Sequence, residues 1–221
     1  RYPLAVRSSL RIANDLENIQ KYSSPFSEVA DMIEGDLLHG EVNVTKNGDV
    51  EFHSQYMTRT KKLPFHLSSS IVKTMASLVI YLRHLARPGD TLIIDEPEMN
   101  FHPDVQVVLA HLFAILANKG LRVVMSTHSD YVVRELNNLI MAGALQNEGK
   151  NELVEKLEYT KDMLLDFHDV EVLFFGLTRR KVIAKSVEID RLGFAISSID
   201  DTITKQNEAS ERLYAELVYT E

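Results

Sequence analysis

Two short apolar runs, separated by a helical pattern, form the centre of this sequence. Residues 91–94 are uncharged and rich in β-branched side chains, which is typical of a strand buried on both faces of a parallel sheet. Residues 121–125 predict a second buried strand. Between them, residues 104–118 carry apolar side chains at helical spacing and end at Lys119-Gly120. The pattern predicts a right-handed parallel β-α-β unit, whose strands end at the same edge of the sheet.

Helical and hairpin patterns on both sides of this unit divide the chain into three predicted parts. Residues 1–66 form a helical lobe with a β-hairpin, residues 67–146 form the core, and residues 147–221 form a small α+β extension. The further helices are expected at 4–22, 27–38, 71–85, 131–145, 152–167 and 199–219. The first hairpin spans 41–53 about Asn47-Gly48, and a second antiparallel pair spans 169–175 and 181–189.

Composition indicates a soluble protein of the cytoplasm. The chain contains no Cys, which suits a reducing compartment, and it has no apolar run near the roughly twenty residues of a membrane span. Its 24 basic and 32 acidic residues give a net charge of −8. This charge disfavours nonspecific DNA binding through these residues, although it leaves DNA binding by a larger assembly open.

An acidic pair, Asp95-Glu96, follows directly after the first predicted strand. Two carboxylates at the end of a buried strand are costly unless a ligand needs them. Mg²⁺ takes one or two protein carboxylates and completes its shell with phosphate and water, so Asp95 is a candidate metal ligand. Glu96 is then the candidate general base that polarises a water molecule for attack on phosphorus. The alternative is an acidic pair that only caps the next helix.

His128 follows the second predicted strand, within the sequence Ser126-Thr127-His128. Because parallel strands end at one edge, we expect His128 to lie near Asp95 and Glu96. An imidazole there contacts a terminal phosphate or orients the attacking water. A histidine that caps the following helix is the alternative.

Three serines, Ser68, Ser69 and Ser70, precede the amphipathic helix that leads to the acidic strand. Serines at a helix start offer hydroxyl and backbone N–H groups to an anion, with the positive end of the helix dipole behind them. They are therefore candidate phosphate-binding residues. Taken alone, the same pattern describes an ordinary N-cap.

The order of these motifs, LSSS, helix, TLIIDEPEMNFHP, helix and VVMSTHSD, resembles the ATPase heads of the ABC superfamily. It is most similar to the SMC, RecF and OLD-like branch, whose members are often called AAA family ATPases. The resemblance implies an α/β fold, a partial ABC-ATPase head with ATP and Mg²⁺ as ligands. It implies these roles: signature for Ser68, Ser69 and Ser70, Walker B metal ligand for Asp95, general base for Glu96, D-loop for 98–103, and switch histidine for His128.

Two departures from the family pattern affect what the chain is expected to do. Ser70-Ile71 stands where many ABC proteins carry glycine, so hydrolysis is expected to be slow. No GxxxxGK[ST] motif is present, and the nearest match places Glu41 where the lysine should be. We expect the chain to be the carboxyl-terminal part of a longer ATPase and inactive alone. The alternative is a natural half-ATPase completed by another protein.

The expected function is therefore an ATP-binding and ATP-hydrolysing head that works as a nucleotide-sandwiched dimer. A second ATPase head is the expected partner, and DNA or an effector protein is left open as a further one. Two other functions remain as alternatives: a nucleotide-gated scaffold with negligible hydrolysis, and the ATPase part of a nuclease or defence system. The candidate acids of a nuclease site are the pair Asp200-Asp201, with Asp190 as the nearest extra acid. A helix cap explains Ser198-Ile199-Asp200 better.

Overall fold

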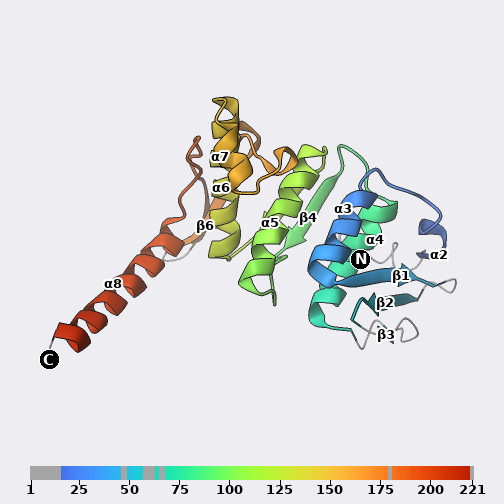
Figure 1. Cartoon of the computed structure of the whole chain (residues 1–221), viewed down its shortest axis with the longest axis horizontal. Helices are drawn as coiled ribbons and strands as arrows, with labels where there is room; N and C mark the ends of the chain where they lie inside the picture. The colour runs from blue at the N-terminus through green and yellow to red at the C-terminus, as the bar shows by residue number, and fades with distance from the viewer. Residues whose placement is uncertain (1–15, 46–48, 57–62, 65–67, 179–180, 220–221) are drawn as a thin grey trace. The chain divides into compact units, whose positions relative to one another are not determined.

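The computed structural model describes residues 16–45, 49–56, 63–64, 68–178 and 181–219 (Figure 1). It divides into two compact units. The first comprises Arg1–Glu135 with Lys161–Met163, and the second comprises Leu136–Thr160 with Leu164–Glu221. Helix α6 (Asp130–Asn147) begins in the first unit and ends in the second.

The amino-terminal part of the first unit joins short helices to a small antiparallel sheet. Helix α2 (Leu16–Ile19) is followed by α3 (Ser27–Met32), which continues as the π-helix η1 (Ile33–Leu38). The sheet has the order β1-β2-β3, from β1 (Gly40–Val44), β2 (Val50–Ser54) and β3 (Leu63–Pro64).

The hairpin predicted over 41–53 is confirmed, because β1 and β2 pair antiparallel with Glu41 opposite His53. Strand β3 is an addition that no sequence pattern indicated. The helix predicted over 27–38 is present, with a π-helical second half. The turn at Asn47-Gly48 and most of the helix predicted over 4–22 lie outside the described residues.

Helix α4 (Ser70–His84) packs the apolar side of its surface into the core of the first unit. Its amphipathic spacing buries Val72, Met75, Val79 and Leu82. After α4, Gly89 adopts a φ of 89° in the turn that leads into the next strand, a conformation that suits glycine. The helix therefore connects the serine-rich segment at its start to the acidic strand after its end.

The predicted parallel β-α-β unit is confirmed. Strand β4 (Thr91–Asp95), helix α5 (Pro103–Asn118) and strand β5 (Arg122–Ser126) follow one another, and the two strands pair parallel. In Figure 1, β4 lies beside α5. Apolar spacing along α5 buries one continuous group of side chains: Leu109, Ala110, Leu112, Phe113, Ala114, Ile115 and Leu116.

The expectation that both strands are buried on both faces is wrong. Leu92 and Ile94 pack against the core, but Ile93, between them, is 74% exposed. On β5, Val124 is 52% exposed in the same way. Successive side chains on a strand point to opposite faces, and in the first unit the core covers only one of them.

The second unit contains the rest of α6, α7 (Asn151–Lys156), β6 (Leu173–Thr178), β7 (Lys181–Ser186) and α8 (Ser197–Tyr219). Short 3₁₀ turns occur at Lys161–Met163, in the first unit, and at Phe167–Asp169. The antiparallel pair and the last helix are confirmed, but the first strand of the pair, predicted over 169–175, begins at Leu173 and continues to Thr178. None of the described helices has the length and apolar character that crossing a membrane requires.

The single helix predicted over 152–167 is wrong beyond Lys156. Glu158 adopts a left-handed φ of 63°, and the N–H of Tyr159 donates to the carbonyl of Val154. The N–H of Glu158 donates to the carbonyl of Glu155 as well. Together these bonds form a Schellman motif, which ends a helix, with Glu in the place usually taken by Gly.

Candidate active site at the carboxyl edge of β4 and β5

Asp95 and Ser126 are the last residues of β4 and β5, and the parallel register places them opposite each other. The Ser126 hydroxyl donates to Oδ1 of Asp95. The same oxygen, Oγ of Ser126, accepts the backbone N–H of Glu96 at 3.0 Å. Ser126 therefore fixes both the Asp95 carboxylate and the peptide of the neighbouring acid.

Glu96 has a left-handed backbone, with a φ of 42°. This conformation is uncommon for a residue with a side chain, and such residues gather at functional sites. The turn that follows is held by the N–H of Met99, which donates to the Glu96 carbonyl at 3.1 Å. The strand thus ends abruptly at Asp95, and Glu96 leaves the sheet in a new direction.

Glu96 and His128 meet at this edge. Oε1 of Glu96 lies 3.3 Å from Nε2 of His128, although the residues belong to segments that follow different strands. The His128 side chain is 86% exposed and that of Glu96 is 35% exposed. The structure therefore brings Asp95, Glu96 and His128 to one edge of the sheet and leaves the imidazole open to a further ligand or surface.

Glu98 follows Glu96 in the turn after β4 and is only 8% exposed. Its Oε1 accepts the Thr127 hydroxyl at 2.6 Å and the backbone N–H of His128 at 3.1 Å. Its Oε2 is buried, with no hydrogen-bond partner among the residues that the structure describes. Sequence reasoning assigned no individual role to Glu98 or to Ser126. The strand register was the one signal that could have found Ser126.

The serines at the start of α4 are not joined to this group. Ser69 is the N-cap residue, and its hydroxyl oxygen accepts the N–H of Val72 at 3.3 Å. Ser68 is buried, with a hydroxyl that has no partner within the described part of the chain. Ser70 is the first residue of α4. No hydrogen bond or ion pair between described residues links Ser68 or Ser69 to Asp95, Glu96 or His128, so phosphate binding by the serines stays a prediction.

The chemistry of the Asp95 edge suits Mg²⁺ bound together with a phosphate. No group of three or more His, Asp or Glu side chains among the described residues could hold a metal by itself. Mg²⁺ needs only one or two protein oxygens when phosphate and water supply the rest. Asp95, oriented by the Ser126 hydroxyl, provides such an oxygen.

Asp190, one of the acids considered for a nuclease site, belongs to a turn. Asp190 accepts the N–H of Leu192 at 2.7 Å and forms an isolated bridge with Gly193. Asp200 and Asp201 lie near the start of α8. Asp190 is therefore explained by the turn that it stabilises.

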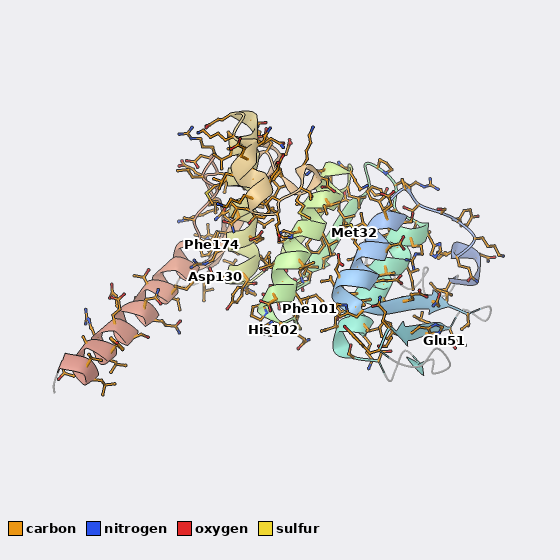
Figure 2. All side chains as sticks on the ribbon, in the orientation of Figure 1. Met32, Glu51, Phe101, His102, Asp130 and Phe174 are labelled. Carbon is orange, nitrogen blue, oxygen red and sulfur yellow. The ribbon has the colours of Figure 1, made fainter. Side chains whose placement is uncertain are left out.

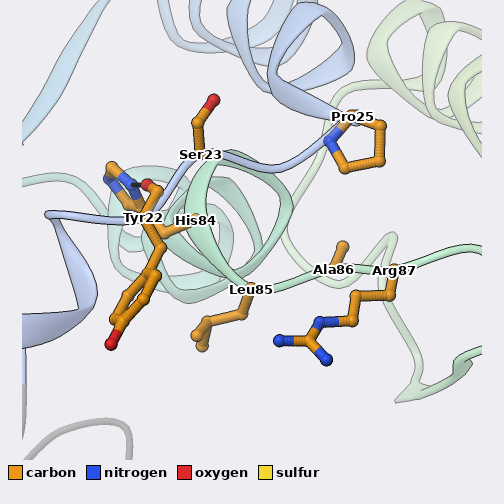
Figure 3. Close-up of a pocket in the computed structure, with 7 residues that line it drawn as sticks. All are labelled: Tyr22, Ser23, Pro25, His84, Leu85, Ala86 and Arg87. Atoms are coloured by element: carbon orange, nitrogen blue, oxygen red, sulfur yellow. Dashed lines mark hydrogen bonds between the residues drawn. The ribbon is translucent and has the colours of Figure 1, made fainter.

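A surface hollow of about 270 Å³ lies at the far end of α4 from Ser69 (Figure 3). Its lining consists of Tyr22, Ser23, Pro25, His84, Leu85, Ala86 and Arg87. The segment after Arg87 leads to the start of β4, whereas Asp95 ends that strand. The hollow is therefore separate from the acidic edge.

Comparison with known proteins gives the family. A solved structure from work on the structural biochemistry of ATP-driven dimerization and DNA-stimulated activation of SMC ATPases aligns with 91% of this chain and 96% of its own, at 11% identity and a TM-score of 0.45. No curated protein matches the chain. The family model of the AAA ATPase domain matches residues 5–133, which include Asp95, Glu96 and His128. Since this match spans more than half of the 221 residues, the chain belongs to the AAA ATPase domain family, and its predicted resemblance to an ATPase is confirmed.

Proposed function

We propose that this chain is the catalytic part of an ATP-hydrolysing head of the ABC type, in the SMC, RecF and OLD-like branch. The observation that carries the proposal is the meeting of Glu96 with His128, 3.3 Å apart, beside Asp95. These three residue types at one sheet edge supply a metal ligand, a base and a phosphate-facing imidazole. Membership of an ATPase family supports the same reaction.

Each side chain has a distinct role in the proposed reaction. Asp95 holds Mg²⁺, which when bound neutralises charge on the phosphate oxygens. Glu96 accepts the proton of the attacking water through its carboxylate. His128, whose ring is exposed beside Glu96, contacts the terminal phosphate or orients the attacking water. Ser126 keeps Asp95 and Glu96 in register through its two hydrogen bonds.

One face of the β4–β5 sheet is exposed, which suggests that a further structural layer covers it. Ile93 and Val124 are exposed apolar residues on the strands that end at Asp95 and Ser126. An apolar sheet face is stabilised when another element covers it. We propose that the covering layer carries the phosphate-binding loop, and that a second head brings its serine segment to the nucleotide. The complete ATPase is then this chain together with that layer.

The test is the variant Glu96→Gln in the complete ATPase. Loss of the base should stop turnover while ATP binding remains, so nucleotide-bound dimer should accumulate and be seen by light scattering. Glu28→Gln is the matched control, since Glu28 lies on the surface in an ion pair with Lys119. Unchanged turnover in Glu96→Gln would refute the proposal. Negligible turnover by the unmodified complete ATPase would favour a nucleotide-gated scaffold.

A further inference from the structure

A closed ring of hydrogen bonds joins the segment after β4 to the loop after β5. From Glu98, the ring passes through the Thr127 hydroxyl to the N–H of Ser129, which donates to Oγ1 of Thr127 at 3.0 Å. The Ser129 hydroxyl then donates to Oε1 of Gln106, and Nε2 of Gln106 donates to the Phe101 carbonyl at 2.9 Å. The N–H of Phe101 donates to the Glu98 carbonyl at 3.0 Å, which closes the ring.

The ring ties together three elements of the first unit. Glu98 and Phe101 belong to the turn after β4, Gln106 to the first turns of α5, and residues 127–129 to the loop that leads into α6. Figure 2 labels Phe101 and His102 at the start of α5, and Asp130 at the start of α6. Ser129 also accepts the N–H of Val132 at 3.2 Å, which fixes the ring to α6.

Glu98 is the member of the ring that touches His128 directly. Its Oε1 accepts both the Thr127 hydroxyl and the His128 N–H, so one buried atom fixes two consecutive residues of the loop. Oε2 of Glu98 is buried without a partner among the described residues, and such burial costs free energy. A buried polar group of this kind calls for an explanation, and the two hydrogen bonds to Oε1 supply one. No hydrogen bond among the described residues joins Glu98 to the side chains of Asp95 or Glu96.

We propose that Glu98 is a positioning residue that sets the place of His128 relative to Glu96. The hydrogen bonds of Glu98 couple the turn at residues 98–101 to the backbone of His128. The link with turnover rests on the proposed function. The positioning itself is a property of this chain and is tested without nucleotide.

The first experiment measures amide hydrogen exchange by NMR in this chain. Glu98→Gln keeps an oxygen acceptor, whereas Glu98→Met has a similar size and lacks one. Loss of a hydrogen bond to a charged group should speed exchange at the His128 amide by about tenfold or more in Glu98→Met. Glu98→Gln should retain most of the protection. The amide of Leu85, which donates to the Tyr81 carbonyl far from the ring, reports on the intact fold.

The second measurement asks whether His128 still senses Glu96. In the unmodified chain, Glu96→Gln should shift the ring-proton resonances of His128, because the two side chains lie 3.3 Å apart. In the Glu98→Met background that response should fall by at least about half, and in Glu98→Gln it should persist. If Glu98 only filled space, both variants would preserve the response, because Gln and Met are both close to Glu in size.

Thr127→Val keeps the proposal falsifiable if Glu98→Met fails to fold. It removes the hydroxyl that links Glu98 to Ser129 and leaves the Glu98 side chain in place. Faster exchange at the Ser129 amide and a weaker His128 response to Glu96→Gln are expected. Unchanged exchange and an unchanged response, in this variant or in a folded Glu98→Met, would overturn the proposal.

Turnover separates this inference from the proposed function. In the complete ATPase, Glu98→Met should lower kcat by about tenfold, as expected for a displaced catalytic group, and leave the KM for ATP within about twofold. If the NMR responses appear as expected but turnover does not depend on Glu96, the positioning stands and the proposed function fails. If turnover depends on Glu96 but the NMR responses are absent, only the positioning fails.

Discussion

Glu34 and Glu96 are carboxylates of the same compact unit, and their surroundings differ in almost every respect. Glu34 is 6% exposed, and both of its oxygens accept from the Arg83 guanidinium, at 3.0 and 2.8 Å. The N–H of Val42 adds a further bond at 2.6 Å. Glu96 is partly open to solvent and meets one exposed histidine. A carboxylate whose partners are all in place holds elements together, whereas one with an open side can act on a ligand.

The Glu34 cluster connects four elements of the first unit. Glu34 lies in η1, Val42 in β1 and Arg83 in the last turn of α4, and Asp31 of α3 also binds Arg83 at 2.5 Å. The hydrogen bond to Glu34 raises the pKa of Arg83, and burial opposes this effect. The cluster therefore holds the last turn of α4 against α3 and η1, and Glu34 also binds β1.

The largest expected effect on stability comes from Glu34→Ala. The substitution leaves the Arg83 charge partly buried with only Asp31 as a partner, so the free energy of unfolding should fall by about 3 kcal/mol. Urea unfolding measures it. Asp31→Asn, at the exposed end of the same cluster, is the control and should cost less than about 1 kcal/mol. Equal losses in both variants would show that buried Glu34 contributes no more to stability than an exposed acid, which would contradict its structural role.

His128→Ala should produce the reverse pattern. In the complete ATPase it should slow turnover by about 100-fold, equal to about 2.7 kcal/mol in activation free energy. The stability of the chain should change by less than about 0.5 kcal/mol, because the side chain is largely exposed. Phosphate release and thermal unfolding measure the two quantities. A large loss of stability would show that His128 is a structural residue like Glu34.

A smaller effect on stability is expected from Tyr81 of α4, which binds Asp90 just before β4. Its hydroxyl donates to Asp90 at 3.2 Å, and burial, followed by the Asp90 charge, raises the pKa of Tyr81 from 10.0 to about 12. The protonated phenol is favoured in the folded chain, so its contribution to stability is complete below pH 10 and is lost as the pH rises toward 12. After allowance for solvent screening, the loss should be about 1 kcal/mol. Urea unfolding at pH 9 to 12 should show less decline in Tyr81→Phe than in the unmodified chain. The same decline in both would contradict this assignment.

Ile93→Thr should have the smallest effect in the isolated chain. Ile93 is 74% exposed, so the free energy of unfolding should change by less than about 0.5 kcal/mol. In the complete ATPase, where we propose that another layer covers this face, the same change should cost about 1 kcal/mol or more. Thermal unfolding of both forms provides the comparison. Equal costs would argue that the face stays uncovered.

Sequence reasoning succeeded where apolar periodicity and the direction of paired strands decide the outcome. The β4-α5-β5 unit follows from apolar periodicity, and the approach of His128 to Glu96 follows from the common edge of parallel strands. The burial of Ile93 could not be judged in this way, because it depends on what covers the far face of the sheet. The helix predicted over 152–167 ends at Lys156, because Glu158 adopts a left-handed conformation that Gly usually takes at a helix end.

The hydrogen bonds of Glu98 and Ser126 were beyond sequence reasoning for a different reason. They join groups about thirty positions apart, and their geometry depends on how the turn after β4 approaches the loop after β5. Glu34 and Glu96 look alike as letters in the sequence. Their difference arises from Arg83, which lies far along the chain from Glu34 and reaches it only in the folded structure.

The most direct measurement is ATP turnover by the complete ATPase carrying the same substitution at the two sites. Glu34→Gln and Glu96→Gln each replace one carboxylate by an amide, and rates are compared at equal folded fraction. We predict that Glu96→Gln loses at least about 100-fold in rate, while Glu34→Gln stays within about threefold, since Glu34 has no part in the chemistry. Wild-type turnover in Glu96→Gln would contradict the assignment of this sheet edge as the site of hydrolysis.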